Sequence, residues 1–308
     1  MYDRIIVPIE EGAGVESLDQ ARCLACTLSC TLSLLHVHLP REAPSELEAL
    51  PQYRYQGVVE AWDERDQEAE EHEQEWLRNL AETLTAEDDR LQVTSQVVHA
   101  PISRSLRRPG ESVLVVAHAG ETVRDGLSPT VLEIVQGGGV PVLVVREGLG
   151  LPEIRRILVT LDGSSFSEEV LDPAIELARA TEAKVSLLEV VTRHSGLVRL
   201  LRPAERSAES AERSLRKIRE RIPEELGAVD VRVVEAGNAA AGIAGEARRE
   251  DIDLVAMATH GRGGMRRLIL GSVAESVIRS TQVPVLLYRP LGALERPRST
   301  RLEAAAES

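Results

Sequence analysis

The sequence predicts an α/β protein made of two tandem doubly wound domains, and three observations lead to this prediction. Its 308 residues are enough for two domains of about 150 residues, each with a core of its own. Short apolar runs of strand length alternate with longer helical patterns. The same patterns recur in the same order in both halves of the chain, so we interpret the sequence as a tandem duplication.

Three pairs of matching segments establish the duplication. The pairs are residues 4–10 and 156–162, 33–37 and 186–190, and 140–146 and 283–289. A linker with Gly and Pro at residues 147–152 separates the copies. We therefore expect domains at residues 1–147 and 154–290, followed by a flexible tail at residues 291–308.

The second copy shows the elements most clearly. Apolar runs that do not alternate with polar residues are typical of strands buried on both faces, and the helices between them supply the crossovers of a parallel sheet. The expected strands are residues 157–161, 185–191, 229–234, 254–258 and 283–288. The expected helices are residues 167–179, 205–221, 239–249 and 273–279.

Composition and charge exclude several function classes. The chain has 36 basic and 50 acidic residues, a net charge of −14, and all of this excess lies in the first 150 residues. An acidic chain with 2% aromatic residues argues against nucleic-acid binding by phosphate contact or base stacking. No apolar run approaches the roughly 20 residues that span a bilayer, and the start has no secretory pattern. We expect a cytoplasmic protein with no membrane partner.

Part of the acidic excess is local. Nine of the sixteen residues at positions 60–75 are acidic. The segment is typical of a solvated helix that connects the second and third strands, and the alternative is an acidic recognition surface. No ligand spacing in it indicates a metal.

Several catalytic classes lack their residues. The two lysines, Lys184 and Lys217, do not follow a glycine loop, so a Walker-type phosphate loop is absent, and so is a G-x-S-x-G elbow. Cys23, Cys26 and Cys30 are spaced i, i+3 and i+7, which favours small buried side chains on one helix face over a redox or metal role.

The most informative segment leads from the strand at 254–258 through a glycine- and arginine-bearing loop to a helix start at Gly271-Ser272. Helix starts carry unpaired N–H groups and partial positive charge, which favour phosphate. Ser272 and Glu275 also fit a capping box, and the two roles can coexist. Arginines in the loop add positive charge: Arg262, Arg266 and Arg267.

Asp162 is a second candidate, because it follows the first strand of the second copy. Open α/β sheets bind ligands at the carboxyl ends of their strands. A carboxylate there can hold a ribose hydroxyl or a phosphate-bound divalent cation. The alternative is a turn in which Asp162 accepts hydrogen bonds from nearby N–H groups.

Together these segments resemble the universal stress protein family in a tandem form, over residues 2–147 and 154–290. Nucleotide-binding members carry G-x2-G-x9-G-[ST]; here the frame reads Ala258-Thr259-His260-Gly261-x9-Gly271-Ser272. Ala258 departs from the pattern and adds a methyl group where the ligand passes. The resemblance implies nucleotide contacts from Thr160, Leu161, Asp162, Val190, Met257, Ala258, His260, Gly261, Arg262, Gly271, Ser272, Val273 and Ala274.

The resemblance also implies individual roles and a fold. Asp162 would contact ribose or a nucleotide-bound Mg²⁺ or Mn²⁺, and the backbone of Val190 would contact adenine. Each domain would be a Rossmann-like, five-stranded parallel sheet in the order 3-2-1-4-5, with helices on both faces. The domains would pair through their last strands, and two chains can associate further as a homodimer.

The first copy departs further from the family pattern. Aligning His118 with His260 puts Leu127-Ser128-Pro129 where Gly-Ser should stand, and Pro129 has no N–H to offer a phosphate. Glu10 and Glu121 add carboxylates around the same place. We interpret this copy as degenerate and unable to bind nucleotide.

The favoured hypothesis is a stress-response regulatory protein that binds ATP or AMP in its second domain and acts on an unidentified protein partner. It is not expected to be an enzyme, because no general base or nucleophile lies beside the site and any hydrolysis would be slow. One alternative is a scaffold protein of the same fold that has lost nucleotide binding because Ala258 replaces the first glycine of the motif. Another is an adenylyl-transferring or ATP-pyrophosphatase-like enzyme. Such an enzyme would need a Ser-Gly-Gly-rich loop after the first strand, and residues 161–165 resemble such a loop only distantly.

Overall fold

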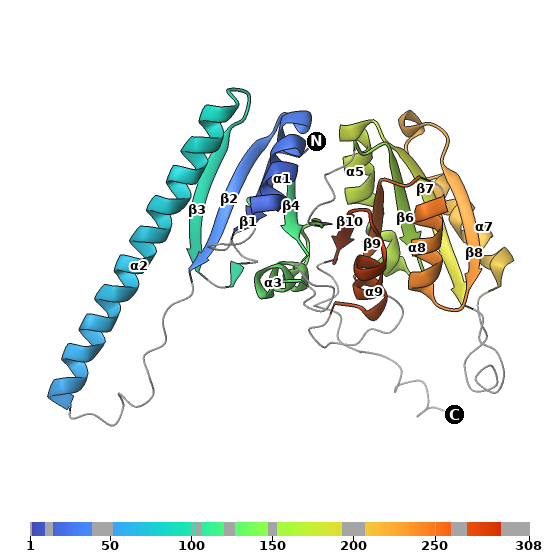
Figure 1. Cartoon of the computed structure of the whole chain (residues 1–308). Helices are drawn as coiled ribbons and strands as arrows, with labels where there is room; N and C mark the ends of the chain where they lie inside the picture. Colours follow the sequence, from blue (N-terminus) through green and yellow to red (C-terminus); the bar gives the residue numbers. More distant parts are fainter. Residues whose placement is uncertain are drawn as a thin grey trace.

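In the computed structural model ten strands form one continuous sheet (Figure 1). The strand order is β3-β2-β1-β4-β5-β10-β9-β6-β7-β8. The structure describes residues 2–9, 15–38, 52–99, 101–102, 106–119, 127–146, 153–192, 207–249, 251–259 and 270–290. The expected linker and tail lie outside these residues.

The first half of the chain, up to residue 146, supplies five strands. They are β1 (Arg4–Pro8), β2 (Thr31–His38), β3 (Val93–His99), β4 (Val113–His118) and β5 (Val142–Val145). The helices of this half are α1 (Val15–Leu28), α2 (Gln52–Glu87) and α3 (Pro129–Gly137).

The second half, from residue 153, supplies the other five strands. They are β6 (Arg156–Leu161), β7 (Lys184–Thr192), β8 (Asp230–Ala236), β9 (Leu254–Ala258) and β10 (Val285–Tyr288). The helical segments are α4 (Ser165–Glu168), α5 (Leu171–Thr181), α7 (Ala208–Arg219), the 3-10 turn η3 (Glu224–Leu226), α8 (Ala239–Arg249) and α9 (Ser272–Ser280).

The topology confirms the expected order 3-2-1-4-5 in each half, with parallel pairing throughout each half. The halves join through their last strands, as expected. β5 and β10 run antiparallel, with Leu143 opposite Leu286 at the centre of the pairing. Each last strand therefore covers an edge that the other half would otherwise leave open.

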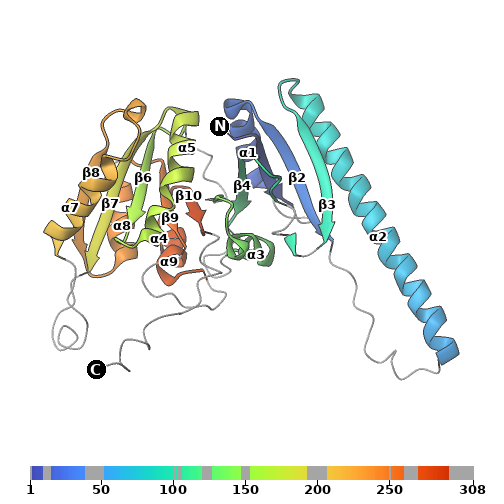
Figure 2. The same ribbon diagram turned by 180° about the vertical axis from the view of Figure 1, so that it is seen from behind.

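Two aliphatic cores lie on opposite faces of the sheet, and each runs through both halves. One holds side chains of α1, α2, α5 and α7, and the other holds those of α3, α8 and α9. Figures 1 and 2 show the positions of these helices from opposite sides. Ile5 and Ile157, at matching positions of β1 and β6, are both fully buried in the first core. Aliphatic side chains make up most of both cores.

Polar contacts also join the halves. The Tyr2 hydroxyl donates to the Pro173 oxygen at 3.2 Å, and Ser112 Oγ donates to Glu176 Oε1 at 2.7 Å. Near the end of β10 the Gly139 N–H donates to the Arg289 oxygen at 2.7 Å. These bonds tie side chains and backbone of one half to the other.

The helix expected at 167–179 is interrupted. It begins earlier, as α4, stops around Glu169 and Val170, and resumes as α5. Pro173 lies in the first turn of α5, where a proline is tolerated. In a continuous helix its ring would clash with the carbonyl of Glu169, four residues earlier, so the break has a local cause.

Other boundaries differ less. The expected helix at 205–221 is α7, which begins at Ala208 and ends at Arg219. The Ser207 side chain caps the helix by accepting from the Ser210 N–H at 3.2 Å. The expected strand at 283–288 begins only at Val285, because Pro284 has no N–H for the ladder. The helix at 239–249 and the strand at 254–258 are confirmed.

The cysteine prediction is wrong for Cys23, which is exposed, and for Cys30, which lies beyond the end of α1. Cys26 and Cys30 are half-buried against the first core, and all three thiols are free. Burial raises the pKa of the Cys30 thiol to about 11 and also raises that of Cys26. These two thiols are therefore protonated at neutral pH and are poor nucleophiles or ligands.

The helix α2 connects the second and third strands, as predicted for the acidic segment. Its 36 residues correspond to about 54 Å, whereas the seven residues of its neighbour β3 span about 23 Å. Figure 1 shows α2 continuing far beyond the carboxyl end of β3. In the described part of the chain no helix, α2 included, is both long and apolar enough to cross a membrane.

Candidate functional site

The start of α9 is held directly beside the end of β9. The Thr259 N–H donates to the Tyr288 oxygen at 3.0 Å, and the Gly271 N–H donates to the Thr259 oxygen at 3.1 Å. The second bond closes the chain excursion between these residues, of which 260–269 lie outside the described part. It fixes the first residues of α9 at the carboxyl edge of the sheet.

Gly271 is required by this close backbone approach. A β-carbon at Gly271 would overlap the backbone oxygen of Thr259. The φ angle of Gly271 is −55°, which any residue adopts, so the glycine is not needed for its backbone conformation. The glycine at this motif position thus has a role in the fold that is independent of any ligand.

The predicted capping box at Ser272 and Glu275 is wrong. The N-cap of α9 is Gly271, which has no side chain to cap the helix, and Ser272 is already its first helical residue. The Glu275 carboxylate pairs with Arg279, one turn later, and does not reach back. The Thr259 bond to Gly271 causes this, because it sets the position at which the helix starts.

The start of α9 is consequently open. The N–H groups of Ser272, Val273 and Ala274 find no acceptor among the described residues. Ser272 is exposed, and Val273 is 39% exposed. Such N–H groups, together with the helix dipole, favour an anion.

Asp162 forms the turn that was one of its two interpretations. Its Oδ1 accepts from the Ser164 N–H at 2.9 Å and from Ser164 Oγ at 2.5 Å, while its own N–H donates to Ser167 Oγ at 3.2 Å. Gly163 between them has a φ of +76°, which favours glycine. The turn fixes the carboxylate at the end of β6.

The other strand residues named for the site share this edge of the sheet. Thr160 lies opposite Met257 in the β6–β9 pairing, and the Thr160 hydroxyl donates to the Ala256 oxygen at 3.4 Å. Leu161 lies opposite the buried Glu189, the residue before Val190. The predicted residues Thr160, Leu161, Asp162, Val190, Met257, Ala258, Gly271, Ser272, Val273 and Ala274 therefore come from neighbouring elements, whereas His260, Gly261 and Arg262 lie outside the described residues.

Sequence reasoning missed one residue next to the site. Gly242 of α8 packs so closely on β7 that a β-carbon there would lie 2.7 Å from Val190 Cγ1. The sequence signal that could have identified it is a glycine inside the alanine-rich first turns of α8. The contact sets the height of α8 over the strand that carries Val190.

The strand registers correct the alignment of the two copies. The Val115 N–H donates to the Pro141 oxygen and the Val255 N–H to the Pro284 oxygen, each at 3.0 Å, so Val115 corresponds to Val255. Counting along the strands, His118 then corresponds to Ala258 and not to His260. The alignment went wrong because the loops that follow differ in length.

The helix start in the first copy is closed. Ser128 is the N-cap of α3, and its Oγ accepts from the Val131 N–H at 3.3 Å. Pro129 occupies the first helical position, where Ser272 stands in α9. In the first copy the Ser128 side chain and the Pro129 ring therefore occupy the helix start, which is open in the second copy. Glu10 and Glu121 lie outside the described residues.

Comparison with known proteins identifies the family. The sequence model of the universal stress protein family matches residues 153–289 of this chain. A universal stress protein of Methanocaldococcus jannaschii is 34% identical over 155 residues, which cover 47% of this chain and 87% of that relative. The chain belongs to the universal stress protein family.

The family likeness extends over both halves. A universal stress protein of Mycobacterium tuberculosis (strain H37Rv) is 29% identical over 225 residues, 68% of this chain and 73% of that relative. The crystal structure of a universal stress protein from Archaeoglobus fulgidus has a TM-score of 0.61 at 17% identity and covers 93% of this chain and 98% of its own. At that identity the structural likeness concerns the fold.

Proposed function

We propose that this universal stress protein binds an adenine nucleotide, ATP or AMP, at the carboxyl edge of the sheet in its second half. The observation that carries the proposal is the contrast between the two helix starts. In α9 the N-cap is Gly271 and the first N–H groups have no described acceptor, whereas in α3 Ser128 and Pro129 close the same place. A phosphate fits the open start by charge and by hydrogen bonding.

The remaining contacts follow from the positions of the strands. The N–H groups of Ser272, Val273 and Ala274 would hold phosphate oxygens. Asp162 would face the ribose or a nucleotide-bound Mg²⁺ or Mn²⁺, and the backbone at Val190 would face adenine. His260, Gly261 and Arg262 would complete the site from the loop.

The proposed activity is regulatory binding. The Asp162 carboxylate is engaged by Ser164, which leaves it a poor general base for nucleotide cleavage. The first half, which we propose to be a domain ending near residue 147, serves as the structural partner through β5. Binding of nucleotide to the second domain, residues 154–290, would then be sensed by an unidentified protein partner in a stress response.

Isothermal titration of the full chain with ATP and with AMP, each with and without Mg²⁺, tests the proposal. The decisive variant is Ser272→Pro, which copies the first half into the second. Proline is favourable at the first helical position, so the fold is retained while one phosphate-binding N–H is removed. We expect the variant to bind ATP at least about tenfold more weakly, the loss that corresponds to one hydrogen bond to a charged group.

The matched control is Pro129→Ser, which changes the corresponding residue of α3 and should leave ATP affinity unchanged. Failure of millimolar ATP and AMP to bind or to raise the melting temperature would refute the proposal and favour a nucleotide-free scaffold. Rapid, stoichiometric turnover of ATP would favour the enzyme alternative.

A further inference from the structure

The side of α2 that faces the sheet changes its chemistry along the helix. Toward its C-terminus Leu77, Ala81 and Leu84 are buried in the first core. Toward its N-terminus the same stripe, at spacings of three and four residues, carries the half-buried acidic residues Asp66, Glu70 and Glu73. The change occurs near the carboxyl ends of β2 and β3. Each of these strands ends in a histidine, His38 in β2 and His99 in β3.

His38, the last residue of β2, is 2% exposed and has a carboxylate at each ring nitrogen. Its Nδ1 lies 2.8 Å from Glu73 Oε2, and its Nε2 lies 3.3 Å from Asp66 Oδ2. A neutral imidazole has one N–H, so one carboxylate would face a lone pair. Both contacts are hydrogen bonds only when His38 is an imidazolium.

The groups around His38 come from three elements. From α2 these are Glu73 and Asp66, and from β3 it is His99, whose ring centre lies 5.4 Å from that of His38 and whose Nε2 lies 3.4 Å from Glu70 Oε1. From β2 itself it is His36.

His36 shares the Glu73 carboxylate. Its Nδ1 lies 2.8 Å from the Ile9 oxygen, which can only accept, so Nδ1 carries a hydrogen, and its Nε2 lies 3.6 Å from Glu73 Oε2. The neighbourhood is therefore three histidines against three carboxylates. Among the described residues no group of three or more His, Cys, Asp or Glu side chains is arranged to hold a metal ion.

We propose that His38 is a proton-operated clamp that holds the acidic segment of α2, residues 63–73, against the sheet. With a proton on each nitrogen it bridges Glu73 and Asp66, two turns apart on the helix. When one proton leaves, one of the two half-buried carboxylates loses its hydrogen bond to His38, and the segment is released. The apolar contacts of Leu77, Ala81 and Leu84 keep the rest of α2 in place.

The direction of the pH response follows from the same contacts. Burial by itself lowers the pKa of His38, but the hydrogen bonds and charges of Glu73 and Asp66 raise it above its ordinary value. A pKa raised in the folded state contributes stability in full below the ordinary histidine value of about 6.5, and the contribution is lost as pH rises through the raised pKa. The clamp therefore holds the acidic segment of α2 when His38 is protonated, and releases it as the pH rises through the raised pKa of His38.

Two measurements on the full chain test the clamp. The first is the NMR titration of the His38 ring proton, identified by its disappearance in His38→Gln. The second is amide hydrogen exchange of residues 66–73, corrected for intrinsic rates, between pH 6 and pH 9. We expect the protection of these amides to fall at least about tenfold over this range, the loss that corresponds to one hydrogen bond to a charged group.

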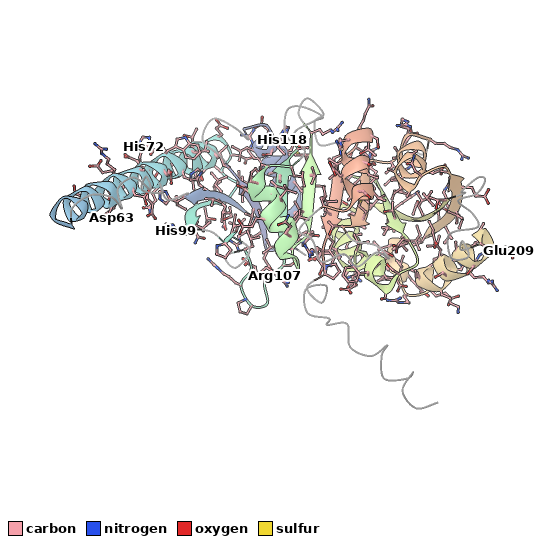
Figure 3. All side chains as sticks on the ribbon, turned by 90° about the horizontal axis from the view of Figure 1, so that it is seen from below. Asp63, His72, His99, Arg107, His118 and Glu209 are labelled. Atoms are coloured by element: carbon pink, nitrogen blue, oxygen red, sulfur yellow. The ribbon has the colours of Figure 1, made fainter. Side chains whose placement is uncertain are left out.

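In His38→Gln this protection should be low at pH 6 and independent of pH, and in Glu73→Gln the His38 pKa should fall. The matched control is His72→Gln, because His72 is exposed and Figure 3 labels it on the side of α2 opposite His99. A His38 pKa at or below 6.5, or equal pH dependence in His38→Gln and the wild type, would overturn the proposal. So would a loss of protection in His72→Gln that matches the one in His38→Gln.

Discussion

The Gly271 N–H donates to the Thr259 oxygen at 3.1 Å, and the Gly271 α-carbon lies so close to that oxygen that no side chain fits between them. One oxygen therefore sets both the start of α9 and the identity of its N-cap residue. The open anion-binding geometry of α9 is a by-product of this backbone contact, since a helix capped by glycine has no side chain over its first N–H groups.

Gly271→Ala is expected to destabilise the protein by about 1–3 kcal/mol, because the methyl group forces the end of β9 and the start of α9 apart. Urea denaturation followed by circular dichroism measures the change. Gly245→Ala in α8 is the control, since its β-carbon meets nothing within 4 Å and alanine is the better helix former. A stability of Gly271→Ala equal to that of the wild type would contradict the contact.

The two roles of Asp162 can be separated. Asp162→Asn keeps an oxygen for the Ser164 N–H and hydroxyl, so its stability should stay within about 1 kcal/mol of the wild type, whereas Asp162→Ala loses both bonds and about 1–3 kcal/mol. If the carboxylate also contacts ribose or metal, Asp162→Asn should weaken Mg²⁺-ATP binding in calorimetry. Unchanged affinity in a stable Asp162→Asn would leave the residue with the turn alone.

The junction between the halves predicts a pair of glycine variants. Gly138 has a φ of +70°, and a β-carbon there would lie 2.9 Å from the Arg289 oxygen of the other half; Gly110, with a φ of +80°, has open space. Alanine strains the backbone at both positions, because both φ angles are positive. Gly138→Ala should cost about 1–3 kcal/mol more than Gly110→Ala in urea denaturation. An equal loss of stability in the two variants would contradict a close contact between Gly138 and the Arg289 oxygen.

Cys23 should react with a thiol reagent before Cys30 does. Cys23 is exposed, whereas the half-buried Cys30 has a pKa of about 11. At pH 8 about one Cys30 thiol in a thousand is a thiolate, so iodoacetamide should modify Cys23 first, as mass spectrometry of digests would show. The Cys30 rate should rise as pH approaches 11. Equal rates for Cys23 and Cys30 at pH 8 would contradict the partial burial of the Cys30 thiol.

The sequence predicted those features that depend on local pattern or on the duplication. Unbroken apolar runs located the strand at 254–258, and the matching segments indicated the duplication, whereas the pairing of the halves through their last strands was implied by the family resemblance. The interruption before Pro173 was missed because the apolar period continues across it. Periodicity reports which face is buried and does not report where a single backbone bond is lost.

The remaining errors concern contacts between residues far apart in the chain. The Ser272-to-Glu275 spacing fits a capping box, but the Thr259 oxygen, twelve residues before Gly271, decides where the helix starts. The correspondence of His118 with Ala258 needed the hydrogen-bond register of the strands. The meeting of His38 with Glu73 depends on how α2 lies across β2 and β3, which no short segment encodes.

The continuity of the sheet has a consequence for dividing the chain. Both cores run through β5 and β10, and Tyr2 reaches Pro173 across the junction, so neither half retains a complete interior when cut from the other. Fragments made by cleavage at residues 147–152 would each expose an apolar last strand and seek a partner for it. The protein is therefore suited to split-fragment complementation, in which two separately expressed polypeptides restore one cooperative unit.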